Sequence, residues 1–351
     1  MKLKKGRYKK LTTTKKYNYG LGLLKAILAF YVVRTHNFNY NSIKNKILSY
    51  LLRERKSHVP SFFIMSFYFM RKDFLSSNIK KYLNRIERLL IPYILWPIIF
   101  FILNNYILNN FIAVGKYSFN DLKYQFLIGQ GINGVFYFHW NLIVVTTIFF
   151  YTIYLCKKKY YLFLIQAFGC FAYFIQYSGY NKKFTEFFRP RMRPTLGRFF
   201  ETIPYASTGF TLSCLNILNI VSNNKIQTLF FCLFIFYLLD KYYIFTEVKS
   251  ENLFSGILYN VRANCLIFIF SLFPSNKITN TKIEILLKII TNYTVGVYFL
   301  HNIIIGYFKN IINPIKNRTL FGILIIYLLC YLICFIGMQI FGKTKLKNLF
   351  S

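Results

Sequence analysis

The sequence predicts an all-α integral membrane protein, a bundle of about ten transmembrane helices. Of the 351 residues, 55% are hydrophobic and only 16% are charged, and the charged residues fall between long apolar runs. A soluble domain carries about 25% charged residues. Because about 20 apolar residues in a helix cross the hydrocarbon core of a bilayer, these runs have the length of membrane spans.

The net charge of +35 arises from 45 Lys and Arg residues against 10 Asp and Glu residues. A nucleic-acid-binding protein gathers its basic residues on a polar face, whereas these lie between apolar runs, so no nucleic acid is expected as a partner. The hydrophobic fraction excludes a disordered chain. The seven cysteines lie in apolar runs without a CxxC pair, which excludes a disulfide scaffold. The lipid bilayer is the expected partner surface.

Apolar runs separated by charged or turn-rich segments define the predicted spans. In chain order they cover residues 19–35, 60–70, 89–108, 135–156, 160–178, 199–221, 228–245, 254–273, 285–308 and 320–341. The second run is short, and the eighth carries Arg262 and Asn264 in its middle. No internal repeat or Gly/Ser linker divides the chain. We therefore expect a basic cytoplasmic tail (1–18), one transmembrane domain (19–342) and a short basic tail (343–351).

The basic residues also predict an orientation. Eight Lys or Arg residues lie in the first sixteen positions, and no small-residue cleavage site follows the first apolar run, so we expect a retained anchor. The bias of basic residues toward cytoplasmic segments favours both termini in the cytoplasm. The basic loop of residues 182–198 opposes this bias. We interpret it as a solvated loop, with contact to anionic headgroups or an anionic substrate as the alternative.

Ionisable side chains inside a span cost about 2.5 to 3.5 kcal/mol on insertion scales, so each needs a partner or a function. Lys25, in the first run, and His36, directly after it in the same expected helix, are 11 residues apart, close to three helical turns, and share one helix face. An interfacial histidine is the simpler interpretation of His36. The functional interpretation is a general base whose pKa lies near the working pH.

A pair of arginines adjoins the third run without a spacer. Arg85 and Arg88 are three residues apart and lie on one side of a helix, where together they suit a phosphate or carboxylate. The alternative is stop-transfer charge flanking a span, which accounts well for Lys80 and Lys81.

Other polar groups are weaker candidates. His301 lies in the middle of the ninth run, where we expect it to face a cavity. Glu201 and Arg262 are candidates to pair with each other or with Lys25. We interpret His139 as a structural, interfacial histidine. No GxSxG, P-loop, HExxH or clustered Cys/His motif is present, so we predict no bound metal and no permanently bound cofactor.

Six segments carry a resemblance to a known family. They are LLKAILAFYVVRTHNF, HVPSFFIMSFYFM, RIERLLIPYILW, FYFHWNLIV, RFFETIPYASTGFTL and TVGVYFLHNIII. In this order they resemble the integral membrane acyltransferase-3 family, whose members O-acetylate surface polysaccharides and related glycans, and the likeness covers about residues 20–341. Two positions depart from the family: Lys25 stands where Arg is usual, and Phe67 where a Gly commonly follows the Ser.

The resemblance implies a fold, an activity and roles for individual residues. It implies transfer of an acyl group, with acetyl expected, from acyl-CoA as donor substrate to a hydroxyl of a carbohydrate or glycolipid. His36 would be the catalytic base with Lys25 as its partner on the same helix face. Arg85 and Arg88 would lie near the acyl-CoA phosphates.

Two other functions remain open. In a transporter or flippase for an anionic lipid or glycan, Lys25, Arg262 and the basic loops would line a translocation path. Against this, the two halves of the chain show no repeat and no matching pair of broken helices. A family member without catalytic activity, which binds a lipid or glycan, is kept open by the departures at Lys25 and Phe67. In all three cases we expect a multi-pass protein in a membrane that the sequence does not specify.

Overall fold

The computed structural model describes most of the chain, in eleven stretches. They are residues 18–37, 58–75, 78–107, 116–132, 134–156, 160–177, 193–246, 253–273, 281–308, 311–317 and 319–350. The basic tail up to residue 17 and the basic loop up to residue 192 lie outside the described residues. No strand occurs in these stretches, which confirms an all-helical protein.

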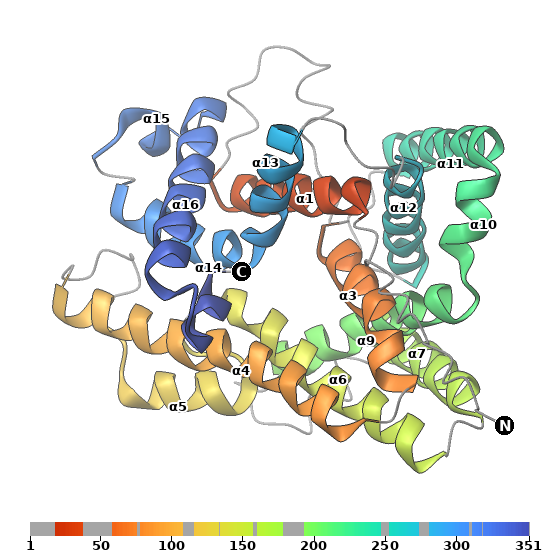
Figure 1. The fold of residues 1–351 in the computed structure, drawn as a ribbon, viewed down its shortest axis with the longest axis horizontal. Helices are drawn as coiled ribbons and strands as arrows, with labels where there is room; N and C mark the ends of the chain where they lie inside the picture. Colours follow the sequence, from red (N-terminus) through yellow and green to blue (C-terminus); the bar gives the residue numbers. More distant parts are fainter. Residues whose placement is uncertain are drawn as a thin grey trace, which may run out of the picture.

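Helices follow each expected apolar run (Figure 1). The helices are α1 (Tyr19–Asn37), α3 (His58–Leu75), α4 (Ile79–Ile102), α5 (Phe119–Ile128), α6 (Tyr137–Leu155), α7 (Tyr161–Tyr177), α9 (Arg193–Cys214), α10 (Ile217–Asn223), α11 (Lys225–Thr246), α12 (Leu253–Ser271), α13 (Thr281–Asn292), α14 (Thr294–Phe308), α15 (Asn313–Lys316) and α16 (Leu320–Phe341). Short helical turns of other pitch are η2 (Leu103–Ile107), η3 (Gly134–Phe136) and η4 (Lys345–Leu349).

Three described helical stretches are long and apolar enough to cross a membrane: Ile79–Ile107, Gly134–Leu155 and Leu320–Phe341. Two bent pairs also pass this test, α10 with α11 at an angle of 107° and α13 with α14 at 58°. By length and composition, the described residues therefore hold three to five candidate spans. The chain is a membrane protein by its apolar helices, and the count of ten spans stays a prediction.

Some helix boundaries differ from the expected runs for local reasons. α4 begins ten residues before residue 89, because the Asn78 side chain accepts a hydrogen bond from the Lys81 backbone N–H and caps the first turn. The pair Arg85 and Arg88 therefore lies inside a helix. The run 199–221 is broken after α9, where Asn216 adopts a left-handed conformation (φ 53°), which Asn tolerates better than most residues.

Close helix packing centres on α9, which contacts α3 and α7 extensively. Gly209 of α9 lies so near α3 that a Cβ there would be 2.1 Å from the Ile64 carbonyl oxygen. Small residues permit such close approach between membrane helices. On α3, Phe67 is fully buried with its ring 5.1 Å from that of Phe149, so α6 accommodates the larger residue at this departure from the family pattern.

A polar network also joins α7, α9 and α12. The Asn260 amide donates to the Tyr173 hydroxyl oxygen at 2.9 Å and to the Thr208 hydroxyl oxygen at 3.0 Å. The Asn264 amide donates in turn to the Asn260 side-chain oxygen at 2.8 Å. Interhelical hydrogen bonds of this kind contribute about 0.6 kcal/mol each in membrane proteins. Asn264, unexpected in an apolar run, thus supports the interhelical contacts of Asn260 from the same helix, α12.

Substitution of Gly209 by Ala should destabilise the protein, because the added methyl group must displace the α3 backbone. We expect a loss of about 1 to 3 kcal/mol, the range for overpacked sites. Thermal unfolding in detergent measures it. The control is Gly134→Ala, since a Cβ at Gly134 would meet only the Arg198 guanidinium, at 3.9 Å. Equal melting temperatures for the two variants would contradict the packing described.

Candidate functional site

Two cavities lie side by side in the helix bundle. The larger, with a volume of about 490 Å³, is lined from α1, α3, α4, α6, α13, α14 and the segment after α16; we call it the cationic cavity. The smaller, of about 290 Å³, is lined by residues that include His36, and we call it the histidine cavity. Tyr298 lines both cavities, so its ring stands between them.

The cationic cavity gathers Lys25, Arg85 and Arg88. Lys25 comes from α1, and its Nζ lies 5.2 Å from the centre of the Phe69 ring on α3, within the range of a cation–π interaction. The two arginines come from α4, where a spacing of three residues places them on one side of the helix. Among the described residues, no carboxylate lines this cavity. The cavity is therefore suited to an anionic ligand.

An imidazole ring lies next to that of His36. The ring centres of His36 on α1 and His301 on α14 are 5.1 Å apart, but only His36 lines the histidine cavity. His301 is fully buried, and its Nδ1 lies 3.2 Å from the Val297 carbonyl oxygen, as a protonated Nδ1 would. The Nε2 atom then carries the lone pair, and it has no hydrogen-bond partner in the described part of the chain. The expectation that His301 faces a cavity stays a prediction, because it lines neither of the two cavities described here.

The surroundings of His36 affect its protonation. His36 follows the expected span 19–35 by one residue and faces the cavity together with His58 and Arg198. Although the His36 residue is exposed overall, the protein atoms around its imidazole partly shield it from water and lower its pKa, and the nearby His58 and Arg198 lower it further. A lowered pKa favours the neutral ring near pH 7. The neutral ring is the form that accepts a proton.

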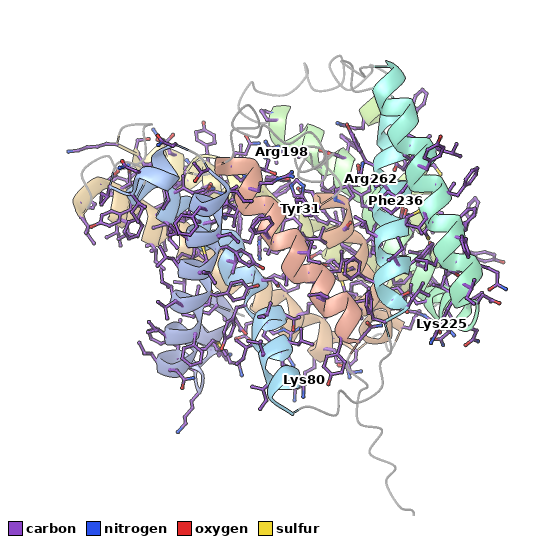
Figure 2. All side chains as sticks on the ribbon, turned by 90° about the horizontal axis from the view of Figure 1, so that it is seen from above. Tyr31, Lys80, Arg198, Lys225, Phe236 and Arg262 are labelled. Carbon is purple, nitrogen blue, oxygen red and sulfur yellow. The ribbon has the colours of Figure 1, made fainter. Side chains whose placement is uncertain are left out.

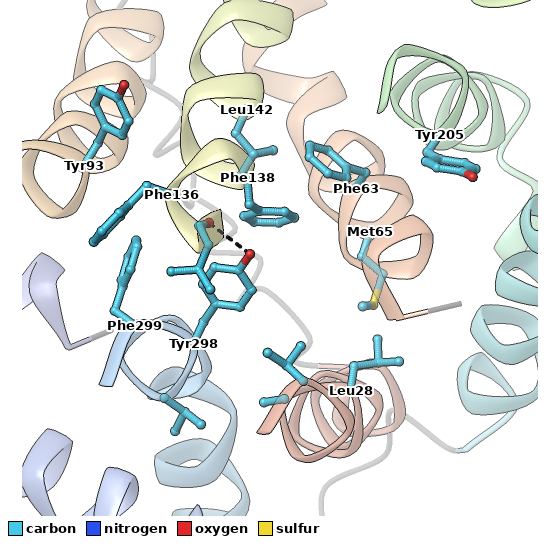
Figure 3. Close-up of a cluster of buried hydrophobic side chains, with 14 of the residues drawn as sticks. Leu28, Phe63, Met65, Tyr93, Phe136, Phe138, Leu142, Tyr205, Tyr298 and Phe299 are labelled. Atoms are coloured by element: carbon cyan, nitrogen blue, oxygen red, sulfur yellow. Dashed lines mark hydrogen bonds between the residues drawn. The ribbon is translucent and has the colours of Figure 1, made fainter. Parts of the chain in front are cut away.

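The partition between the cavities is held in place. The Tyr298 hydroxyl donates a hydrogen bond to the Val135 carbonyl oxygen at 3.1 Å (Figure 3). Its ring centre lies 5.2 Å from that of Phe138 and 6.1 Å from that of His301. Lys25 and His36 are thus reached from different cavities, at points on α1 that are about 16 Å apart at 1.5 Å per residue.

Arg198 is held at the wall of the histidine cavity. Its guanidinium lies 4.1 Å from the centre of the Tyr137 ring and donates to the Gly134 carbonyl oxygen at 3.3 Å. In Figure 2, Arg198 and Lys80, in the first turn of α4, lie toward opposite edges of the molecule.

The structure places two further candidates away from both cavities. Glu201, on α9, lies near Tyr137 and Tyr173. Arg262, on α12, has its guanidinium carbon 5.4 Å from the centre of the Phe236 ring on α11 (Figure 2). Neither residue lines the cationic cavity, so the described structure does not bring them to Lys25.

Two residues have a different position from the one that the sequence suggests. His139 is not interfacial: it is only 2% exposed, lines the cationic cavity, and lies 4.5 Å from Phe299 between ring centres. Arg34, which the sequence did not single out, is 0% exposed, with its guanidinium carbon 4.6 Å from the Tyr31 ring centre. The available signal for both residues was their place inside an apolar run.

No three His, Cys, Asp or Glu side chains gather into a metal-binding group in the stretches that the structure describes. The described cysteines lie as free thiols. The absence of a bound metal stays a prediction.

Comparisons with known proteins return one result. A family model described as an acyltransferase domain matches residues 18–339, which confirms the resemblance carried by the six sequence segments. No curated protein and no solved structure matches the chain.

Removal of the charge at Arg198 should raise the pKa of His36, because a neighbouring cation disfavours the imidazolium. We expect a pKa below 6.5 in the parent and a higher value in Arg198→Gln, measured by NMR titration of labelled histidine in detergent. His36→Gln assigns the signal. Lys225→Gln, at an exposed position far from the cavity, is the charge control. A His36 pKa at or above 6.5 in the parent would contradict this description.

Proposed function

The chain belongs to the acyltransferase-3 family, and from this premise we propose the reaction that it catalyses. In this proposal the protein is a membrane-bound acyltransferase that moves an acyl group, acetyl in the first instance, from acyl-CoA to a hydroxyl of a carbohydrate or glycan. One observation carries the proposal: a cavity lined by Lys25, Arg85 and Arg88 and a cavity lined by His36 share Tyr298 in their walls.

The cationic cavity is the proposed donor site. Coenzyme A carries several phosphate charges, and arginine guanidinium groups bind phosphate through paired hydrogen bonds. Arg85 and Arg88 project from one side of α4 into the cavity, and no described carboxylate opposes them there. Lys25 lies on α1 in the same cavity, where its ammonium group would orient the thioester arm or stabilise the oxyanion.

The histidine cavity is the proposed acceptor site. His36 would take the proton from the acceptor hydroxyl while the hydroxyl oxygen attacks the thioester carbonyl carbon. The new C–O bond forms, the C–S bond breaks, and the leaving thiolate takes the proton from the His36 imidazolium. His301, whose ring adjoins that of His36, is proposed as a positioning residue. Arg198 and Asn302 supply polar groups for the acceptor.

The alternative functions receive less support. A transporter or flippase would need a continuous path for a whole lipid or glycan, whereas the hydrogen-bonded Tyr298 ring lies between the two cavities. Acyl transfer needs only the thioester group to pass that ring. An inactive family member is disfavoured because Lys25 retains the positive charge of the usual Arg, and because Phe67 is accommodated by packing against Phe149.

Replacement of His36 by Ala should lower acyl transfer by about 10²- to 10⁴-fold, the range for a lost general base, without loss of expression. Lys25→Arg should retain activity, and Lys25→Met should not. Transfer of radiolabelled acetyl from acetyl-CoA to a glycan fraction is the measurement. Parental rates in His36→Ala would remove the catalytic assignment and favour the transporter.

Replacement of both Arg85 and Arg88 by Gln should raise the KM for acetyl-CoA and make the remaining affinity less dependent on salt. The matched control is the double variant Lys80→Gln, Lys81→Gln, which removes two exposed charges one to two turns earlier on the same helix. If both double variants change the KM equally, the arginines serve only as flanking charge.

A further inference from the structure

The chain after α16 returns to the cationic cavity. Thr344 caps the turn η4 by accepting a hydrogen bond from the Leu346 backbone N–H, and η4 packs against α4 and α16 (Figure 1). Leu349 and Phe350 are buried. The segment that we expected as a short basic tail, residues 343–351, thus keeps its lysines exposed but packs its last two described residues into the bundle. We call residues 344–350 the strap.

The strap is attached to the bundle at its far end by one aromatic residue of α4. The Trp96 indole N–H donates to the Leu349 carbonyl oxygen at 3.2 Å, in a buried position. The Trp96 ring also packs edge-on against Phe350 with 6.2 Å between ring centres. Because α4 also carries Arg85 and Arg88, this contact fixes the strap relative to the donor arginines.

Two glycines make room for the Phe350 residue. A Cβ at Gly337 on α16 would lie 2.6 Å from the Phe350 ring, and a Cβ at Gly296 on α14 would lie 3.0 Å from its carbonyl oxygen. The ring stacks on Phe341 at an interplanar angle of 7°. Phe350 of the strap therefore packs into space that glycines on α14 and α16 leave open.

The attachment near the arginines is electrostatic. Lys345 pairs with Glu87, which lies between Arg85 and Arg88 in sequence. Both partners are exposed, so the pair contributes less than about 1 kcal/mol to stability. It nevertheless places the Lys345 ammonium group of the strap beside Glu87, the acidic residue between the two arginines.

The strap brings Asn348 to the wall of the cationic cavity. Asn348 lines this cavity together with Arg85, Arg88 and the hydroxyl-bearing Thr291 and Thr294. Its amide makes no hydrogen bond within the part of the chain that the structure describes, so both its donor and its acceptor can meet a ligand. A phosphate would use only the NH2 group of this carboxamide, whereas an amide can pair with both its NH2 and its carbonyl oxygen. The carboxamide is a good match for an amide.

We propose that the strap completes the donor site and that Asn348 binds the amide groups of the pantetheine arm of the donor thioester. This inference rests on the proposed function. Trp96 is then a positioning residue, which acts through the Leu349 carbonyl. In this proposal the charged and the neutral parts of the donor bind to different residues. The arginines bind the phosphates of the nucleotide, and the strap binds the neutral arm between the nucleotide and the thioester.

Two donors test this division, acetyl-CoA and acetyl-pantetheine, which lacks the nucleotide and its phosphates. Asn348→Ala should raise the KM for both donors by a similar factor of about 3- to 10-fold, as expected for one lost hydrogen bond. Arg85→Gln with Arg88→Gln should raise the KM for acetyl-CoA alone. Trp96→Phe, which keeps the aromatic packing and deletes the N–H, should shift the KM in the direction of Asn348→Ala. The matched control is Asn223→Ala, at an exposed position on α10.

The possible results distinguish a failure of the inference about Asn348 from a failure of the proposed function. An unchanged KM for both donors in Asn348→Ala, with an active parent, overturns the inference and leaves the proposed function in place. A change for acetyl-CoA alone also overturns it, because Asn348 would then contact the nucleotide. A parent protein that transfers acetyl from neither donor overturns the proposed function itself. Equal melting temperatures of Asn348→Ala and the parent establish that a changed KM reflects binding.

Discussion

The need to keep cationic side chains inside an apolar helix bundle is the constraint on which this structure depends. An isolated charge in such surroundings is costly, and an aromatic face is a compensation that a helix bundle can offer. The pattern recurs on several helices: a cation lies over a ring in the pairs Lys25–Phe69, Arg34–Tyr31, Arg198–Tyr137 and Arg262–Phe236. Figure 2 labels residues of three of these pairs: Tyr31, Arg198, and Arg262 with Phe236. The aromatic content thus has a structural use beyond filling the core.

Rigid packing keeps the two cavities apart. Close contacts at Gly209, Gly296 and Gly337 fix the backbones of the helices that surround them. The side chain that lines both cavities, Tyr298, is held by a hydrogen bond to Val135 and packs against Phe138 (Figure 3). A donor cavity and an acceptor cavity that meet at one ring allow a small acyl group to be exchanged while the two larger molecules remain on their own sides.

Much of this arrangement could be predicted from local patterns, and the rest could not, for physical reasons. Apolar runs predicted the helices. The spacing of Lys25 and His36 predicted that they share one helix face, but not that they line two different cavities. The burial of His139 and Arg34, and the meeting of His36 with His301, depend on how distant helices cross. No local pattern encodes such crossings. The strap was missed because its lysines suggest a solvated tail, whereas two buried residues, Leu349 and Phe350, decide its position.

The central claim is that the two cavities hold a donor and an acceptor between which an acyl group is transferred. The most direct measurement follows radiolabelled acetyl from acetyl-CoA in vesicles that contain the purified protein and a glycan acceptor. The account predicts label bound covalently to the glycan, with free coenzyme A released in equal amount. Intact acetyl-CoA or unmodified glycan crossing the membrane, without covalent label on the glycan, would contradict it.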